Sequence, residues 1–255
     1  MGIVNAWKGL WSSGDGMQPS AVSDIVRPRR QMRAYAGATV DRLTANWMSS
    51  QLSADAEIRG SLRKLRDRSR EMVRNNPYAK QAKRTTQINV VGTGMKFQSL
   101  VTQVRGNKRD QKVNKSIESK WNDWCRAENC DTAGRHSFHQ FEWLATGALP
   151  ESGEAIFRIV RKPFGSSGVP LALQLIESDL LDEEYSGSTT NKNNEWRNGV
   201  EVNEWGKPVR FAILKRHPGD AFYINTPNAG KEHIFLPAND VIHLFMPERP
   251  GQNRG

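Results

Sequence analysis

Four side chains that can bind metals lie within fifteen residues of one another. They are Cys125, Cys130, His136 and His139, in the spacing C-x4-C-x5-H-x2-H. Thiolates and imidazoles are the usual ligands of structural zinc, but such sites commonly have longer intervals between ligand pairs and an H-x3–5-H pair. The spacing therefore favours structural cysteines and two histidines at a helix start, with zinc as the lower-ranking alternative. We expect no cofactor.

A second cluster with chemical potential is a run of carboxylates after a predicted strand: Glu177, Asp179, Asp182, Glu183 and Glu184. Paired carboxylates can hold a divalent cation or transfer protons. No His or Lys stands at a defined spacing from them, and a Ser/Asn-rich segment follows, so we interpret the run as a solvated surface. The isolated His243 lies in an apolar strand and is expected to be structural.

The common catalytic signatures are missing from the sequence. It contains no G-x-S-x-G, no H-E-x-x-H and no G-x-x-x-x-G-K-[ST]. The G-x-G of Gly92 and Gly94 follows a predicted helix, whereas a dinucleotide loop follows a strand. The sequence thus gives no indication of an enzyme or of an ATP-driven motor.

Basic residues are concentrated near the start of the chain. The net charge is +10, and residues 1–90 hold 16 Lys and Arg against 7 Asp and Glu. Arg27, Arg29, Arg30 and Arg33 could bind phosphates, because Arg suits bidentate contact with phosphate or carboxylate oxygens. No base-reading motif accompanies them, so such contacts would be independent of DNA sequence. An arm that wraps a neighbouring subunit accounts for the charge equally well.

The predicted elements divide the chain into three parts: a basic and partly disordered arm (1–53), a helical region (54–150) and a β-rich region (151–255). Helices are predicted at 53–75, 77–91, 112–125 and 138–149, the last stopped by Pro150. Strands are predicted at 95–104, 154–162, 171–176, 199–202, 208–215 and 241–245. Helices that precede a mostly antiparallel β region indicate an α+β fold.

Local signals fix several of these boundaries. Ser53 is a predicted N-cap, Asn76 caps the next helix with Pro77 at its first position, and Gly92 or Gly94 supplies its left-handed end. One apolar stripe on the first helix is expected to face the core. It comprises Ile58, Leu62, Leu65, Met72 and Val73.

Composition sets broad limits. With 255 residues, 37% of them hydrophobic, the chain can form one large or two small domains. Two cysteines do not make a disulfide scaffold, and no apolar run is long enough for a membrane helix. Met1–Leu10 does not have the pattern of a secretory signal.

Two dense segments resemble a known family. The first runs from Leu62 to Gly94 and includes Arg74-Asn75-Asn76-Pro77 and Gly92-Thr-Gly94. The second runs from Val241 to Gly255 and includes His243, Arg249-Pro250-Gly251-Gln252 and Arg254-Gly255. Together with Trp121, Trp124 and Gly153-Glu154, they resemble the lambda-type portal proteins of tailed bacteriophages.

This resemblance implies a structural protein, a dodecameric ring at one capsid vertex through which double-stranded DNA passes non-specifically. The implied partners are other copies of the chain, the large terminase subunit, head–tail connector proteins, and the major capsid and scaffold proteins; no membrane is involved. The implied location is the virion, with assembly in the host cytoplasm. Family members are longer, so the chain is expected to contain a wing-like region without stem, clip and crown.

Two alternatives remain open. The first is a sequence-independent DNA-binding protein that uses the basic arm, which predicts salt-dependent binding. The second is a metal-dependent enzyme that uses the Cys/His cluster or the acidic run, which predicts stoichiometric metal. Trp196 and Trp205 could belong to an interaction patch or could fill the core between strands.

Overall fold

The computed structural model describes residues 42, 45–46, 51–104, 106–191, 193–223 and 232–255. The chain divides into two units, residues 1–50 and 51–255. Almost everything described here belongs to the second unit. The four arginines of the predicted basic arm, from Arg27 to Arg33, lie outside the described residues.

Two helices replace the single helix predicted for residues 53–75. Helix α1 spans Ala54–Arg59 and α2 spans Leu62–Asn75. Ser53 caps α1 as predicted, because its side chain accepts the Ala56 N–H. The interruption follows from Gly60 and from Ser61, whose hydroxyl donates back to the carbonyls at the end of α1.

The next junction matches its prediction. Helix α3 spans Pro77–Val91. The Asn76 side chain accepts the Tyr78 N–H at 2.9 Å and Pro77 occupies the first helical position. Gly92 and Gly94 both have positive φ angles, +53° and +82°, and a side chain there would be strained.

Three more helices follow: α4 (Gln111–Trp124), the short α5 (Ala127–Cys130) and α6 (Phe138–Ser152). Pro150 does not end α6, contrary to the prediction; it lies inside the last turn, where it removes only the hydrogen bond of its own nitrogen. Gly153 ends the helix instead, in the left-handed conformation with φ +83°.

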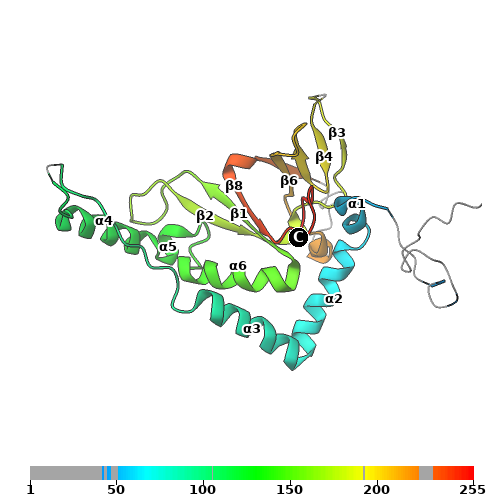
Figure 1. Cartoon of the computed structure of the whole chain (residues 1–255), viewed down its shortest axis with the longest axis horizontal. Coiled ribbons are helices and arrows are strands. Elements are labelled where there is room, and N and C mark those ends of the chain that lie inside the picture. Colours follow the sequence, from blue (N-terminus) through cyan, green and yellow to red (C-terminus); the bar gives the residue numbers. More distant parts are fainter. Residues whose placement is uncertain (1–41, 43–44, 47–50, 105, 192, 224–231) are drawn as a thin grey trace, which may run out of the picture. The chain divides into compact units, whose positions relative to one another are not determined.

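A three-stranded antiparallel sheet has the order β2-β1-β8. Its strands are β1 (Glu154–Val160), β2 (Ala172–Ile176) and β8 (Val241–Phe245). Because β1 is central, Ile156 pairs with Ile176 on one side and with His243 on the other. The sheet thus joins residues far apart in the sequence (Figure 1).

A five-stranded antiparallel sheet has the order β3-β4-β5-β6-β7. Its strands are β3 (Gly187–Ser188), β4 (Glu195–Arg197), β5 (Val200–Val202), β6 (Pro208–Leu214) and β7 (His233–Pro237). Strands β3, β4 and β7 were not predicted, since they are short or follow a polar stretch of the sequence. Short 3-10 helices cover Ser178–Leu180 (η2), Pro218–Tyr223 (η3) and Ala238–Asp240 (η4).

The predicted strand at 95–104 is wrong. Only one isolated bridge, between Thr102 and Arg109, occurs there. The Ser99 and Val101 N–H groups are instead bound by the side chains of Glu118 and Asn114 on α4. Side-chain acceptors thus replace the partner strand that the pattern of alternating residues implied.

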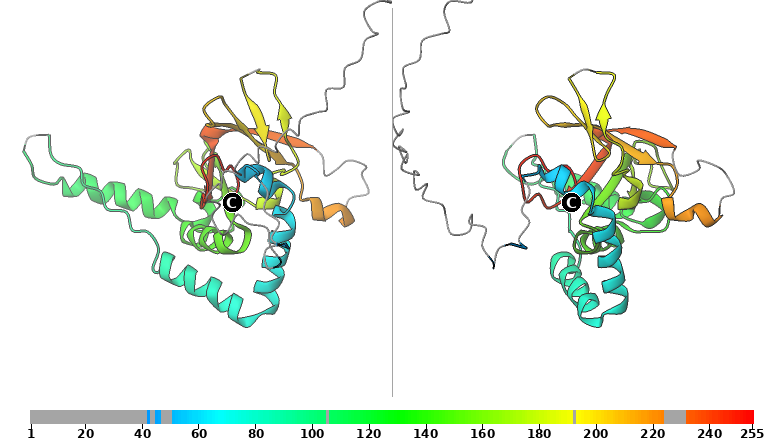
Figure 2. Two further views of the ribbon diagram at one scale, coloured as in Figure 1. Left: turned by 45° about the vertical axis from the view of Figure 1, so that its right-hand side comes forward. Right: turned by 90° about the vertical axis from the view of Figure 1, so that its right-hand side faces the viewer.

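Two hydrophobic cores lie on opposite faces of β1, as the two-residue period of a strand requires. Ile156 joins the core shared by the two sheets, with Val200, Phe211 and Leu236. Phe157 joins a core formed with α4 and α6. Figure 2 shows α6 beside the small sheet, and α4 extending away from it. The α+β prediction is confirmed, with helices first and two antiparallel sheets after them.

The predicted apolar stripe of the first helix is only partly buried. Leu62 is in the core, but Leu65 and Met72 are 57% and 58% exposed. Arg66 is buried in their place because it faces the carboxylate of Glu154. None of the helices in the described part of the chain is long and apolar enough to span a membrane.

Candidate functional site

Residues from both family-like segments meet at a buried carboxylate, Glu154, the first residue of β1. Its side chain is fully buried, as is that of Arg254. Arg254 Nε lies 3.1 and 2.9 Å from the two Glu154 carboxylate oxygens, and its Nη2 lies 2.5 Å from Oε1. This two-pronged pair supplies most of the charge balance that a buried carboxylate needs.

The remaining donors of Arg254 are also occupied. Nη1 donates to the carbonyls of Leu181 and Asn198 at 3.0 and 2.8 Å, and Nη2 approaches that of Ser178. One guanidinium therefore joins β1 to three loop positions that follow β2 and β4. Such a fully hydrogen-bonded arginine holds these segments in one arrangement.

Two further side chains complete the cluster. Arg66 of α2 donates to Glu154 Oε1 at 3.2 Å and to Asp179 Oδ1 at 3.1 Å. His243 of β8 places Nε2 2.8 Å from Glu154 Oε2, so that nitrogen must carry the donated proton. The prediction of a structural His243 agrees with this contact.

The electrostatics of the cluster favour an ionised Glu154. Burial opposes ionisation most strongly, but the nearby Arg254 and the hydrogen bond from His243 together outweigh it and hold the pKa of Glu154 below its usual range. Asp179 behaves alike: burial opposes its ionisation, and Arg70 and Arg66 outweigh burial to lower its pKa.

The segment before Arg254 is attached to α1. The Asn253 backbone and side-chain amides donate to Asp55 at 2.9 and 2.7 Å, and Arg249 pairs with Glu57 at 2.7 Å. The Gln252 side chain accepts the Glu248 N–H and donates to the Arg254 carbonyl, which shapes the loop. Pro250 and Gly251 make its turn, where Gly251 has φ +80°.

Two glycines meet beside Glu154. A Cβ on Gly153 would lie 2.6 Å from the Gly255 carbonyl carbon, and one on Gly255 would lie 2.0 Å from the Gly153 oxygen. Only glycine fits at either position without movement of the backbone. The segment from Arg249 to Gly255 is thus fixed by charge, hydrogen bonding and close backbone contact.

The first family-like segment forms the junction between α2 and α3 and the end of α3. Asn76 and Pro77 have the capping roles described above, and Arg74 and Asn75 are exposed in the last turn of α2. Gly94 lies against α6, where a Cβ would come within 2.5 Å of His139 Nδ1. The adjacent Met95 N–H donates to Glu142 at 3.0 Å.

The four potential zinc ligands point to separate partners. The Cys130 thiol donates to the carbonyls of Cys125 and His136, His136 lies 3.1 Å from Asp131, and His139 lies 3.3 Å from Glu142. Burial raises the pKa of Cys125 to about 11 and that of Cys130 to about 12. Zinc binds thiolates, so it would have to displace a proton from each of these thiols.

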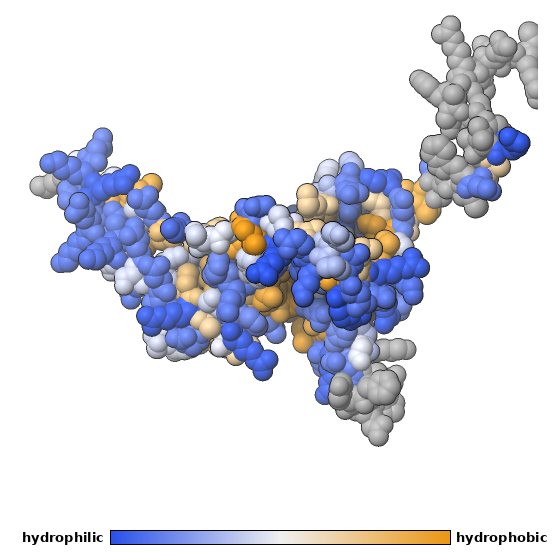
Figure 3. All heavy atoms as spheres, turned by 90° about the horizontal axis from the view of Figure 1, so that it is seen from below, coloured by the Kyte–Doolittle hydropathy of each residue, from blue (hydrophilic) through white to orange (hydrophobic). Residues whose placement is uncertain are grey.

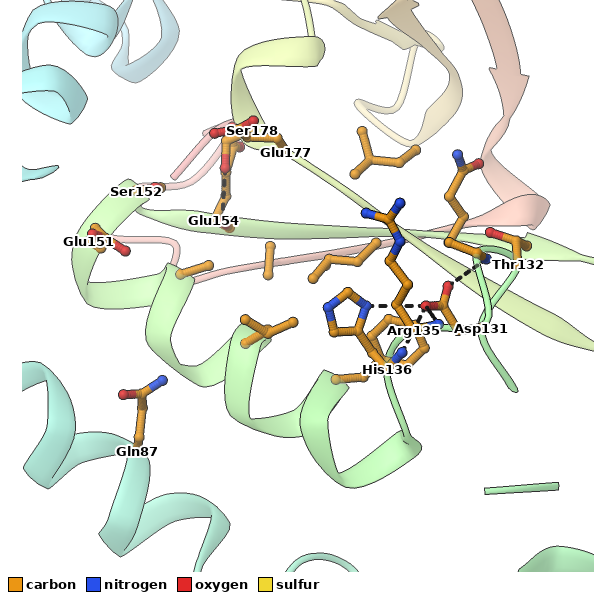
Figure 4. Close-up of a pocket in the computed structure, with 18 of the residues that line it drawn as sticks. Gln87, Asp131, Thr132, Arg135, His136, Glu151, Ser152, Glu154, Glu177 and Ser178 are labelled. Atoms are coloured by element: carbon orange, nitrogen blue, oxygen red, sulfur yellow. Dashed lines mark hydrogen bonds and ion pairs between the residues drawn. The ribbon is translucent and has the colours of Figure 1, made fainter. Parts of the chain in front are cut away.

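A pocket of about 590 Å³ contains the Asp131–His136 pair. Figure 4 shows this pair at one end and Glu151, Ser152 and Glu154 at the other. Asp131 also accepts the N–H groups of Ala133, Arg135 and His136, and these bonds outweigh its burial to lower its pKa. Its carboxylate thus orders the loop between α5 and α6.

The acidic run is less solvated than predicted. Asp179 pairs with Arg66 and Arg70, Asp182 lies 2.7 Å from His233, and burial raises the pKa of Glu183. Glu177, Asp179 and His217 form the one grouping of potential metal ligands found among the described residues. The guanidinium of Arg70 contacts both of its carboxylates, at 3.5 and 2.5 Å, and so neutralises the charge that would attract a cation.

The central role of Glu154 and Arg66 was not predicted from the sequence. A glutamate that opens the apolar strand Glu-Ala-Ile-Phe was the available signal, because a charge among buried residues requires a partner. Arg66 does not belong to the apolar stripe predicted for its helix. Nothing in its local sequence distinguishes it from Arg63, Arg68 or Arg70.

Comparison with known proteins identifies a family and a relative. The sequence model of the family described as "Phage portal protein, lambda family" matches residues 40–255. A protein of Halomonas phage phiHAP-1 described as "Probable portal protein" is 36% identical over 259 residues. That alignment covers 100% of this chain and 48% of the relative, so the chain spans about half the relative's length.

Proposed function

Because the chain belongs to the lambda family of phage portal proteins, we propose that it forms the wing-like part of a subunit in a portal ring at one capsid vertex. This family is one of structural proteins. The observation that carries the proposal is the cluster at Glu154, where both family-like segments meet. Charged side chains of the two segments pair with Glu154 inside the chain, as expected of a structural protein.

The proposed ring conducts double-stranded DNA into and out of the capsid without chemistry. Its proposed partners are other copies of the chain, the large terminase subunit, head–tail connector proteins, and the major capsid and scaffold proteins. The wing-like part contributes contacts between copies and with the capsid. The proposed place of the ring is the virion, and it assembles in the host cytoplasm.

Negative-stain electron microscopy tests this function. The purified chain is compared with a longer protein, in which the second half of a family member is fused after residue 255. Rings with a central hole in the longer protein support the proposal, and rings in both show that this part carries assembly contacts. A longer protein that stays monomeric at every salt concentration contradicts the proposal.

One observation favours sequence-independent DNA binding as a second candidate. Helix α2 exposes four basic side chains that are not used by the Glu154 cluster: Arg63, Lys64, Arg68 and Arg74. Such a row can neutralise phosphates. Binding of the chain to random duplex DNA, measured against salt concentration, tests it. We expect the affinity for DNA to decrease steeply as the salt concentration rises. In a variant with all four residues replaced by Gln, this decrease should be shallower.

A further inference from the structure

A second carboxylate lies beside the Glu154 cluster without a partner of its own. Glu183 lines a pocket of about 460 Å³ between α2, the residues that follow η2, and β7. Its Oε2 atom is buried and receives no hydrogen bond from the described residues. Burial has the largest effect on this group and raises the pKa of Glu183. Most of the surface in Figure 3 is hydrophilic, so a carboxylate oxygen turned away from water is an exception.

Basic groups near Glu183 do not compensate for its burial. Arg66 and Arg63 of α2, together with Arg254, favour its ionisation through space. Arg66 and Arg254 are engaged with the Glu154 carboxylate instead. The attraction of the three guanidinium groups is therefore weaker than the cost of burying a charge on Glu183.

Acidic groups around the pocket add to this cost. The negative charge of Asp179 raises the pKa of Glu183 further. Asp179 itself stays ionised, because the arginines of α2 outweigh its burial and lower its pKa. The other titratable side chains that line the pocket are Asp182, Glu184 and His233. Two carboxylates of one pocket are thus driven in opposite directions, which commonly marks a functional site.

Glu183 lies in a turn whose two ends are fixed. Before it, Asp182 donates its N–H to the Ala212 carbonyl at 3.2 Å. After it, the Tyr185 carbonyl accepts the Gly199 N–H at 2.8 Å. The bond that closes the turn, from the Tyr185 N–H to the Asp182 carbonyl, is longer, at 3.3 Å. The turn can therefore open locally while its ends stay in place.

The residues that follow the turn hold strands β3 and β4, at the edge of the five-stranded sheet. Tyr185 packs edge-on against Trp196 of β4, with ring centroids 4.9 Å apart. The Ser186 hydroxyl accepts the Asn198 N–H at 3.1 Å, and Gly187 begins β3, which pairs with β4. A change in the turn therefore affects the edge of this sheet.

We propose that proton binding by Glu183 closes the turn 182–185 and that proton release opens it. A neutral carboxyl can remain in the pocket, because it is cheaper to bury than a carboxylate and is not repelled by the charges of Asp179 and its neighbours. An ionised Glu183 has to turn toward water, and the long bond of the turn breaks as it leaves. The order of β3 and β4 then depends on pH. This property belongs to the single chain and is independent of ring formation.

The effect on stability has the opposite sign to that of Glu154. Because the pKa of Glu183 is raised in the folded chain, its contribution is present in full below the ordinary glutamate value of about 4.3, and it is lost as the pH rises through the folded value. At neutral pH an ionised Glu183 therefore weakens the fold, whereas an ionised Glu154 supports it.

Glu183→Gln tests the proposal, because it keeps the shape of a neutral carboxyl at every pH. Its urea midpoint should lie above that of the unchanged chain at about pH 7, and the two midpoints should agree at about pH 4. Glu184→Gln is the matched control, since Glu184 is the exposed neighbour and loses the same charge. Its midpoint should stay close to that of the unchanged chain. An equal increase in both variants would overturn the proposal, because loss of any negative charge here would then suffice.

Hydrogen exchange locates the effect in the chain. At about pH 7, the Tyr185 and Gly199 N–H groups should exchange severalfold more slowly in Glu183→Gln than in the unchanged chain. They should also slow more than the amides of β1, which report on global unfolding. A stabilised variant whose turn and β1 slow equally overturns the proposal, because the carboxylate then acts on the whole fold rather than on the turn.

Carbon-13 NMR of labelled glutamate carboxyls gives a direct measurement on the unchanged chain. The spectrum of Glu183→Gln identifies the Glu183 signal by its loss. We expect this signal to titrate above the ordinary glutamate value of about 4.3. Titration at or below that value overturns the proposal, as do equal urea midpoints of Glu183→Gln and the unchanged chain at both pH values.

Discussion

The guanidinium of Arg254 lies against the carboxylate of Glu154, one hundred residues earlier in the chain, with Nε 2.9 Å from Oε2. Both side chains are excluded from solvent. Arg66 reaches the same carboxylate from α2, and His243 reaches it from β8. A single carboxylate therefore joins helix α2, the strands β1 and β8 of the small sheet and the segment 249–255.

Replacement of Arg254 by Ala should strongly destabilise the chain. It leaves Glu154 buried without its main partner, and loss of one member of a buried pair costs about 3–5 kcal/mol. The carbonyl oxygens of Leu181 and Asn198 also lose the hydrogen bonds that Arg254 donates to them. Urea denaturation followed by circular dichroism measures the free energy of unfolding.

Arg249→Ala provides the matched control. Arg249 lies in the same segment and pairs with Glu57, but both side chains are about half or more exposed. An exposed pair contributes about 0–1 kcal/mol, so this variant should remain close to the unchanged chain. Equal losses in the two arginine variants would show that the segment, rather than the buried charge, determines stability.

Stability should decrease in acid partly through Glu154. Because its pKa is lowered in the folded chain, its contribution is present in full above about pH 5, and it is lost as the pH falls through the ordinary carboxylate range toward the folded value. Glu154→Gln should be less stable at neutral pH and should show a shallower decrease between about pH 5 and 3. Part of the decrease should remain in Glu154→Gln, because the pKa values of Asp131 and Asp179 are also lowered in the folded chain.

Urea midpoints measured at several pH values check this expectation. The useful comparison is the slope of unfolding free energy against pH in the two proteins, because a uniform loss of stability leaves that slope unchanged. Parallel curves over the acid range would mean that Glu154 is not the group whose protonation weakens the fold.

Local signals in the sequence predicted the elements that those signals determine. Ser53, Asn76 and Pro77 have the capping positions expected of them, and the helix 77–91 has the predicted bounds. The errors arose where distant residues decide. Asn114 and Glu118 bind the backbone that the pattern assigned to a strand, and Glu154 draws Arg66 into the core in place of Leu65.

The Glu154 cluster could be recognised only in part for the same reason. The resemblance identified Arg254 and His243 as family-motif residues, and the residue types identified them as polar. Their common partner depends on how β1, β8 and α2 pack, which no local pattern specifies. The acidic run illustrates the converse, because charges that appear solvated in sequence are paired with Arg66 and Arg70 in the fold.

Gly153→Ala should destabilise the chain more than a glycine replacement elsewhere. The added Cβ would lie 2.6 Å from the Gly255 carbonyl carbon, in a backbone conformation with φ +83°. Gly168→Ala is the control, since Gly168 has φ +67° but nothing within 4 Å of its Cβ position. Conformational strain of about 1 kcal/mol is common to both variants, so the excess loss measures the contact with Gly255. Thermal unfolding of the two variants makes the comparison, and equal melting temperatures would argue against a close contact.

Asn114→Ala should loosen the loop of residues 95–110 without unfolding the rest of the chain. The side chain makes three hydrogen bonds to Ser99 and Val101, so its loss leaves the loop held by Glu118, which accepts the Ser99 N–H, and by Phe97 on Trp121. Hydrogen exchange of residues 96–104 should become faster, while exchange in β1 and β6 stays unchanged, because local opening requires less free energy than global unfolding. Asn122→Ala, an exposed position on the same helix, is the control. If exchange in the loop is the same in both variants, the loop is ordered by the Phe97–Trp121 contact and by Glu118 rather than by Asn114.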